Sequence, residues 1–244
     1  MKLVTEGVRF RVIDDFLSED DLKSMSDLVS SLEFECRPSV VDYEGDGEAH
    51  RSRGAILWHD DVVEGSANGT ADSIPDAYRE VFSELAKYPE ILGRAGVDWS
   101  VVGLTFWQYA AGNRLGWHND TGTERCGEFI LFLHDEWRAS WGGELLLLDR
   151  DPDSLGEVPE GLSPVEAVEA RVSQAEDCLV AIVPKPNRLV IVQEGTIHCI
   201  HRVDRTAGEK IRQTMTGFVA SSLPDRRATE VRSVERLATL LGSS

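Results

Sequence analysis

The chain has 244 residues, a length that suits one large domain or two small ones. Hydrophobic residues make up 41% of it and charged residues 28%, which is the composition of an ordinary globular protein and excludes a disordered, collagenous or coiled-coil chain. Its 25 Lys and Arg residues face 43 Asp and Glu residues, and the net charge of −18 argues against nucleic acid or anionic lipid as a partner.

The sequence shows no segment for membrane insertion or export. No apolar run approaches the roughly 18–20 residues of a membrane span, and the N-terminal MKLVTEGVRFRV lacks the apolar stretch of a signal peptide. We therefore expect a soluble, cytoplasmic protein with no membrane partner, and the sequence leaves the oligomeric state open. The four cysteines form no C-x-x-C pair, so a structural zinc site is disfavoured.

The first hundred residues combine one strand pattern with two helix patterns. Apolar residues alternate with arginines over residues 8–12, which predicts a half-buried strand. Apolar residues at helical spacing predict one helix over 18–32 and a second over 73–88. Between them, the polar and Gly-containing residues 37–69 hold a possible short strand at 54–58, and their length is typical of a lid or binding loop.

From Trp99 onward the pattern changes to short strands that are rich in β-branched and aromatic residues. Near-continuous apolar runs predict strands buried on both faces, and no helix of 10–15 residues separates them, so a parallel βαβ sheet is disfavoured. A mainly β sandwich or jelly roll with flanking helices is therefore expected. The candidate strands are SVVGLTFWQYA, GEFILFLHDEW, GGELLLLD, CLVAIVP, RLVIVQE and RQTMTGFVAS.

These patterns predict one structural domain with three parts. Residues 1–98 form an N-terminal strand and helical support region that carries the candidate lid at about 37–69. Residues 99–221 form the core, with an acidic, Pro-containing insertion at about 151–177. Residues 222–244 form a C-terminal helix.

The stretch LGWHNDTG holds a candidate pair of metal ligands. His118 and Asp120 are two residues apart, so on an extended strand both side chains point to one face and can reach a single ion. His198 and His201 follow late in the β-rich region; they are three apart and face opposite ways on one strand, so only one of them should be a ligand. Two histidines and one carboxylate form the facial triad of non-haem Fe(II) oxygenases. Zinc also binds such a set, but the H-E-x-x-H motif of the common zinc proteases is missing.

Arg212 and Thr214 share one face of the last candidate strand. A guanidinium beside a hydroxyl makes a fork that suits a carboxylate. A dicarboxylic cosubstrate that chelates the metal at one end would need such a partner at the other.

Residues 99–221 resemble the prolyl 4-hydroxylase-like branch of the Fe(II)/2-oxoglutarate-dependent dioxygenases. The N-terminal FLSEDDL also resembles this branch. The resemblance implies a double-stranded β-helix (a cupin-like jelly roll) with helices packed outside. The matching segments, in order, are FWQYAAGNRLGWHND, ERCGEFILFLHDEW, WGGELLLL, RLVIV and HRVDRTAGEKIRQT.

The resemblance assigns the catalytic iron to His118, Asp120 and His201. His201 is selected over His198 because His-Arg-Val matches the H-x-V pattern of the family. The presence of Asp120 favours hydroxylation or another oxidation over halogenation, since halogenating relatives lack this carboxylate.

The resemblance also implies how 2-oxoglutarate is held. Its far carboxylate is assigned to Arg212, helped by Thr214, and Tyr109 matches a tyrosine that contacts the cosubstrate. Where some relatives carry a further tyrosine, this sequence has Leu131 or Phe132.

Candidate substrate-binding residues come from two places. Trp107 and Arg125 lie within the matching segments, while Arg51, Arg53 and Trp58 lie in or beside the candidate lid. For each of them, core packing or a surface position is the alternative role. We expect His134, in the corner FLHDEW, to be a solvated loop residue.

The resemblance implies an Fe(II)- and 2-oxoglutarate-dependent dioxygenase that uses O2 to hydroxylate an unactivated C–H bond, releasing succinate and CO2. Ascorbate is a further candidate cofactor. We expect the substrate to be a free amino acid or small metabolite, because the chain shows no appended peptide-binding or targeting module. The alternatives are a peptidyl prolyl (or other protein residue) hydroxylase and a non-catalytic metal-binding β-helix protein.

Overall fold

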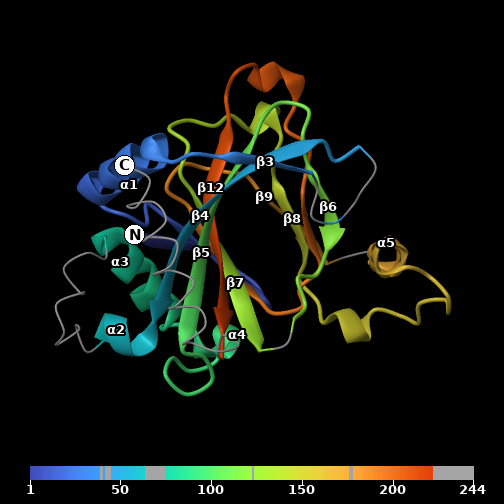
Figure 1. Ribbon diagram of the computed structural model, residues 1–244. Helices are drawn as coiled ribbons and strands as arrows, with labels where there is room; N and C mark the ends of the chain where they lie inside the picture. Colours follow the sequence, from blue (N-terminus) through green and yellow to red (C-terminus); the bar gives the residue numbers. More distant parts are fainter. Residues whose placement is uncertain (39–40, 42–44, 64–74, 123, 176–177, 222–244) are drawn as a thin grey trace, which may run out of the picture.

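The computed structural model shows two antiparallel sheets that face each other, with helices on the outside (Figure 1). This confirms the expected mainly β, double-stranded β-helix architecture. The structure describes residues 1–38, 41, 45–63, 75–122, 124–175 and 178–221.

Within the described residues, the larger sheet has eight strands and the smaller has four. The larger sheet has the spatial order β1 (Lys2–Glu6), β2 (Phe10–Asp14), β10 (Leu189–Gln193), β7 (Arg125–Phe132), β12 (Arg212–Ala220), β5 (Val101–Tyr109), β4 (Glu48–Trp58) and β3 (Glu35–Pro38). The smaller sheet has the order β6 (Leu115–His118), β11 (His198–Ile200), β8 (Leu145–Leu148) and β9 (Leu179–Ile182). The helices are α1 (Glu19–Ser31), α2 (His59–Val63), α3 (Asp76–Leu85), α4 (Pro89–Leu92) and α5 (Pro164–Gln174), with short 3-10 turns at Ala139–Trp141, Pro152–Ser154 and Arg205–Ala207.

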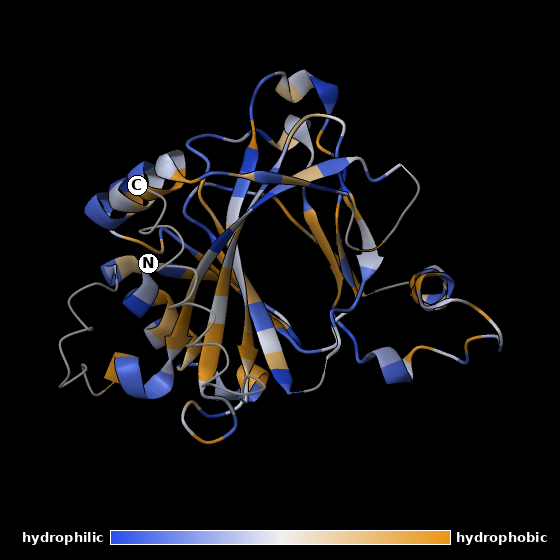
Figure 2. Ribbon diagram, in the orientation of Figure 1, coloured by the Kyte–Doolittle hydropathy of each residue, from blue (hydrophilic) through white to orange (hydrophobic). Residues whose placement is uncertain are grey.

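The apolar runs of the central strands are buried on both faces, as predicted. On β7, Phe129 and Leu131 join the core beneath the helices, whereas Ile130 and Phe132 pack between the two sheets against Leu145. This alternation follows from the two-residue period of a strand. Hydrophobic colours accordingly run along the strands of both sheets in Figure 2. The inward faces of β7, β12 and β5 therefore meet the small sheet, and this is where an enclosed site can form.

Helices α1 to α4 pack against the large sheet, whereas α5 lies beside β6 of the small sheet (Figure 1). In α1, the Ser18 side chain accepts a hydrogen bond from the backbone N of Asp21 at 3.1 Å, and Met25 and Val29 are buried. Helix α3 buries Val81 and other apolar residues in the same core. Both helices match the sequence pattern, because a helix with one apolar stripe must cover a sheet or another helix. No helix in the described ranges is long and apolar enough to cross a bilayer.

Three segments differ from the expected pattern or extend it. The short strand expected at 54–58 is the second half of the 11-residue β4, whose pairing with β5 outweighs the low strand propensity of its Gly and charged residues. The 151–177 segment carries α5, which begins with a capping box between Ser163 and Glu166. The helix expected at 222–244 and part of the candidate lid lie outside the described residues.

His134 is not a solvated loop residue, which corrects the expectation. Its side chain is buried, its Nε2 lies 2.9 Å from the carbonyl oxygen of Pro184, and its ring packs against Trp137. The chain turns back at this corner and folds Trp137 over the imidazole. Burial lowers the pKa of His134 to about 4, so the ring is neutral at physiological pH.

Candidate metal centre

A cavity of about 300 Å³ lies between the two sheets. It is lined from the large sheet by inward-facing residues of β4, β5, β7 and β12, and from the small sheet by residues of β6, β8 and β11. Alternate residues of β12 (Arg212, Thr214, Thr216 and Phe218) line it, as the two-residue strand period requires. Each candidate site residue from the sequence can therefore be described by whether or not it lines this cavity.

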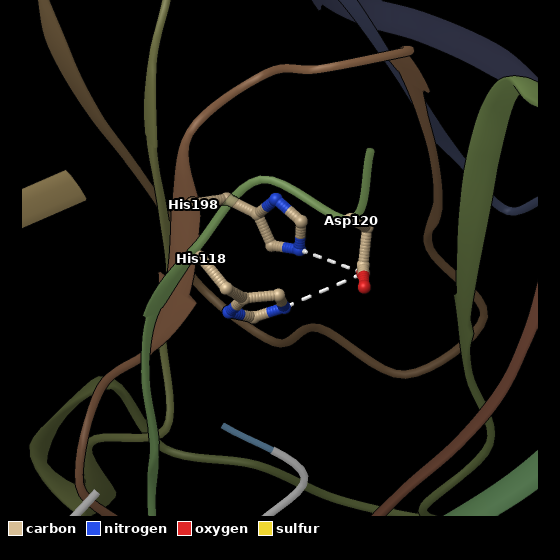
Figure 3. Close-up of side chains that lie close together, drawn as sticks. All are labelled: His118, Asp120 and His198. Carbon is tan, nitrogen blue, oxygen red and sulfur yellow. Dashed lines mark ion pairs between the residues drawn. The ribbon is translucent and has the colours of Figure 1, made fainter. Parts of the chain in front are cut away.

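His118, Asp120 and His198 converge in this cavity (Figure 3). The register of the small sheet pairs His118, at the end of β6, with His198, at the start of β11, and the two ring centroids are 4.2 Å apart. The Oδ2 atom of Asp120 lies 3.4 Å from Nε2 of His118 and 3.7 Å from Nε2 of His198. One ligand atom from each residue lies within 4.8 Å of the others, so a single cation can bind all three.

Backbone carbonyls orient both imidazoles for metal binding. The Nδ1 of His118 lies 2.7 Å from the carbonyl oxygen of Gly116, and the Nδ1 of His198 lies 2.9 Å from that of Thr196. A carbonyl oxygen can only accept, so each Nδ1 donates its proton and each Nε2 presents a lone pair toward Asp120. Metal-binding histidines are commonly held in this way.

The charges in the cluster suit a cation. Burial and the neighbouring His198 lower the pKa of His118, so its ring is neutral. Burial alone would raise the pKa of Asp120, but the neighbouring His118 and His198 imidazoles and Arg125 bring it below its usual range, so the carboxylate is ionised. A neutral imidazole beside an ionised carboxylate is the protonation state that a divalent metal needs.

The structure corrects the choice of His201 as the second histidine ligand. The His201 side chain is 59% exposed, and its Nδ1 lies 3.1 Å from Oε2 of Glu144. Strand β11 spans only three residues, and its register sets His198 opposite His118. His201 follows after the strand, away from the cavity. The H-x-V motif predicted the wrong histidine ligand, because the register of the strands, and not the local sequence, decides which imidazole lies opposite His118.

Arg212 and Thr214 place a buried guanidinium and a buried hydroxyl in the same cavity. Both side chains are about 1% exposed. The Nε of Arg212 donates to the carbonyl oxygen of Gly143 at 2.7 Å, but its Nη1 and Nη2, and the Oγ1 of Thr214, have no hydrogen-bond partner among the described residues. Buried polar atoms are rarely left unpaired. A guanidinium fork beside a hydroxyl suits a carboxylate.

Aromatic rings enclose the Arg212 guanidinium. The Phe132 ring centroid lies 4.9 Å from its Cζ, and the Tyr109 ring centroid 5.9 Å. Leu131 and Phe132 were the two candidates for the position at which some relatives carry a further tyrosine. Phe132 points inward between the sheets, whereas Leu131 packs beneath the helices. Burial lowers the pKa of Arg212 to about 10, so it is a cation at neutral pH. A desolvated cation with free donors binds an anion strongly.

The other predicted residues divide into two groups. Trp107, opposite Thr214 in the sheet, and Arg51, opposite Trp107, both line the cavity. Arg53 is exposed and Trp58 lies at the far end of β4, and neither lines it. Because neither residue lines the cavity, this geometry does not support the prediction that Arg53 and Trp58 contact substrate.

Arg125 contacts Asp120 directly. Its Nη1 donates to the Asp120 backbone oxygen at 2.5 Å and lies 3.6 Å from Oδ1, while its guanidinium packs 3.7 Å from the Phe218 ring centroid. Asp120 has a φ of +45°, a left-handed conformation that costs energy for a residue with a side chain. Arg125 therefore stabilises the backbone turn that aims the carboxylate at the two imidazoles.

Replacing Arg125 with alanine should weaken metal binding about tenfold, the lower end of the effect of removing a group that orients a ligand. Titration with Co(II), followed by its visible absorption, measures this. Arg138→Ala, an exposed arginine that stacks on Trp141, is the matched control and should bind Co(II) like the wild type. Equal affinity of Arg125→Ala and the control would show that Arg125 does not position Asp120.

Sequence reasoning missed Glu128. It lies on the inward face of β7, its side chain is 13% exposed, and its Oε1 is 3.4 Å from Nε2 of His198. Burial raises its pKa to about 7. A charged residue two positions before Ile130 on an otherwise apolar inward face was the signal that could have identified it, because buried charges are rare without a role or partner.

Comparisons with known proteins agree with this geometry. Residues 104–220 match the family model described as the 2OG-Fe(II) oxygenase superfamily. No curated protein matches the sequence at a significant level. Solved structures share the fold at low identity. A prolyl-4-hydroxylase from Pseudomonas putida is 15% identical, with 88% of this chain and 93% of that chain covered and a TM-score of 0.53.

Two further structures carry ligands. HygX from Streptomyces hygroscopicus, with nickel, 2-oxoglutarate and hygromycin B bound, is 12% identical over 89% of this chain and 84% of its own, with a TM-score of 0.52. The epimerase SnoN, in complex with Fe3+, alpha ketoglutarate and nogalamycin RO, is 12% identical over 87% and 78%, with a TM-score of 0.55. The family match over residues 104–220, the fold and the histidine–aspartate cluster together support an enzyme of the 2OG-Fe(II) oxygenase superfamily, with Fe(II) and 2-oxoglutarate as cofactors.

Proposed function

We propose that the enzyme hydroxylates an unactivated C–H bond of a free amino acid or small metabolite and converts 2-oxoglutarate to succinate and CO2. One observation carries this proposal. The unpaired donors of Arg212 and Thr214 open into the same cavity as the His118, Asp120 and His198 cluster. A dicarboxylate can thus be held at one end by the guanidinium while its other end meets the metal.

The residues of the cluster have separate roles in this proposal. His118, Asp120 and His198 hold Fe(II) on one side and leave the remaining coordination positions for exogenous ligands. The iron and 2-oxoglutarate, when bound, supply the oxidising chemistry, and the protein supplies orientation and electrostatics. The retained Asp120 carboxylate favours hydroxylation over halogenation, since halogenating members of the family lack it.

The surroundings of Arg212 strengthen its hold on the cosubstrate. Phe132 and Tyr109 keep water from the guanidinium, which raises the strength of its charge-assisted hydrogen bonds. Burial raises the pKa of Tyr109, so its hydroxyl keeps its proton and can donate to a carboxylate. Thr214, opposite Trp107 in the sheet, supplies a further donor.

The size of the cavity favours a small substrate. About 300 Å³ must hold 2-oxoglutarate and the reacting part of the substrate, which is the low end of the range for ligand pockets. A single inserted side chain of a peptide would also fit this volume, so peptidyl hydroxylation is the second candidate. An intact cluster with an unpaired anion site counts against a non-catalytic binding protein.

The test has two stages. Fe(II) and 2-oxoglutarate, added without O2, should produce the weak visible charge-transfer band of the chelated cosubstrate. With O2, free amino acids and proline-containing peptides are then screened by mass spectrometry for a gain of one oxygen atom and an equal amount of succinate. We expect a free amino acid or small metabolite to give coupled product. Product from peptides alone would favour the second candidate, and the absence of the band in folded protein would refute the proposal.

A further inference from the structure

Arg51 is a cation that lines the active-site cavity and takes no part in the proposed binding of metal or cosubstrate. Three arginines are among the described residues that line this cavity. Arg212 is assigned to the cosubstrate, and Arg125 donates to the backbone oxygen of Asp120. Arg51 is the third, and its place on β4, opposite Trp107 of β5, puts it on the inward face of the large sheet.

The guanidinium of Arg51 has neither a hydrogen bond nor an ion pair within the described part of the chain. It contacts the ring of Trp107, whose centroid lies 5.8 Å from its Cζ. The residue directly across from it on β3 is Glu35, but the carboxylate of Glu35 forms an ion pair with Arg37. All the N–H donors of Arg51 are therefore available, and a planar guanidinium held beside an aromatic ring suits a carboxylate.

The cosubstrate has no carboxylate left for Arg51. In the proposed arrangement, one carboxylate of 2-oxoglutarate binds Arg212 and the other end binds the metal. Strand β5, which carries Tyr109 and Trp107, lies between β12 and β4, so Arg51 is two strands from the strand of Arg212, or roughly 10 Å (Figure 1). Tyr109 contacts Arg212, Trp107 contacts Arg51, and the two ring centroids are 6.4 Å apart. The cavity thus offers a second anion-binding group.

Arg51 and the metal-binding cluster come from opposite walls of the cavity. Arg51 belongs to the large sheet, whereas His118 and His198 belong to the small sheet. Facing sheets lie roughly 10 Å apart, so a molecule the size of an amino acid can contact Arg51 and place a C–H bond beside the metal. The carboxylates that line the cavity, Asp120 and Glu128, lie 3.7 and 3.4 Å from Nε2 of His198, and neither forms an ion pair with Arg51.

We infer that Arg51 binds the carboxylate of the substrate, so that the enzyme selects small carboxylic acids, such as free amino acids, over their amides and over internal residues of peptides. This inference rests on the proposed function and specifies its substrate class. The guanidinium can donate two parallel hydrogen bonds to a carboxylate, and Trp107 covers one side of the pair. An amide carries no charge and presents one acceptor oxygen, so it loses the charge-assisted contact.

The test compares wild type, Arg51→Gln and the control Arg53→Gln, which removes the same charge from an exposed residue of the same strand that does not line the cavity. Free amino acids, each matched with its C-terminal amide, are assayed for stimulation of succinate formation. We expect free acids to stimulate the wild type and the control. Amidation, or the Arg51→Gln change, should raise the half-saturating concentration about tenfold or more, the scale of losing one charged hydrogen bond. Amidation should cause little further loss in Arg51→Gln, because both changes remove the same contact.

Several outcomes would overturn the inference. They are equal stimulation by acids and their amides, an unchanged half-saturating concentration in Arg51→Gln, and no stimulation by any free acid. The anaerobic charge-transfer band with Fe(II) and 2-oxoglutarate separates this result from the proposed function. Arg51→Gln should give the band at the same 2-oxoglutarate concentration as the wild type. A higher requirement in that variant would assign Arg51 to the cosubstrate and overturn the inference, and absence of the band in the wild type would refute the proposed function itself.

Discussion

Replacing His198 with alanine is expected to abolish iron binding and succinate formation, whereas His201→Ala should leave both near the wild-type level. His198 is one of three side chains that converge on a common point, and its Nε2 lies 3.7 Å from Oδ2 of Asp120. His201 is exposed and pairs with Glu144. Removing one of three ligands leaves two, which hold a divalent ion poorly, while removing an exposed imidazole changes little.

The two histidine variants control for each other, because they lie three residues apart and delete the same side chain. Iron content after anaerobic reconstitution and succinate yield per protein give two readouts. Circular dichroism and thermal unfolding check that each variant is folded. Loss of iron in His201→Ala with retention in His198→Ala would restore the assignment that the H-x-V motif suggested and refute the geometry described above.

Arg212→Ala should raise the concentration of 2-oxoglutarate needed for half-saturation by about 30-fold to a few thousand-fold, the equivalent of roughly 2–5 kcal/mol for one partner of a buried charge pair. Metal binding should be unaffected, since Arg212 lies outside the cluster. Titration of 2-oxoglutarate against the anaerobic charge-transfer band measures the effect without turnover. Arg212 donates to Gly143 and is fully buried, so thermal unfolding must show that the variant is folded.

Two further variants test what the Arg212 guanidinium and the Thr214 hydroxyl each contribute to 2-oxoglutarate binding. Arg212→Lys keeps the charge but loses the planar guanidinium fork. Its half-saturating concentration of 2-oxoglutarate should therefore lie between those of the wild type and Arg212→Ala. Thr214→Val removes one unpaired hydroxyl and keeps the shape, and a loss of about fivefold is expected for a single hydrogen bond. An unchanged 2-oxoglutarate requirement in Arg212→Ala would show that the cosubstrate binds elsewhere.

The sequence alone determined the class of fold and two of the three candidate metal ligands. Alternating and near-continuous apolar runs depend on local spacing, so the strands around Phe129 and Leu189 could be predicted from the two-residue period. The same period put His118 and Asp120 within reach of one ion, and Arg212 and Thr214 on one face. These relations hold between residues that are close in the sequence, so the local strand conformation is enough to determine them.

The tertiary structure alone decided which groups from distant segments share the cavity. His198 and His201 are equally placed by local pattern, and only the pairing of β11 with β6 sets His198 opposite His118. Arg125 gained its contact with Asp120 from the left-handed turn that follows β6, and Glu128 became an active-site carboxylate because β7 faces the small sheet. Strand register is set by the sum of many cross-strand contacts, and a shift of one residue would reverse every side chain, so no short motif can encode it.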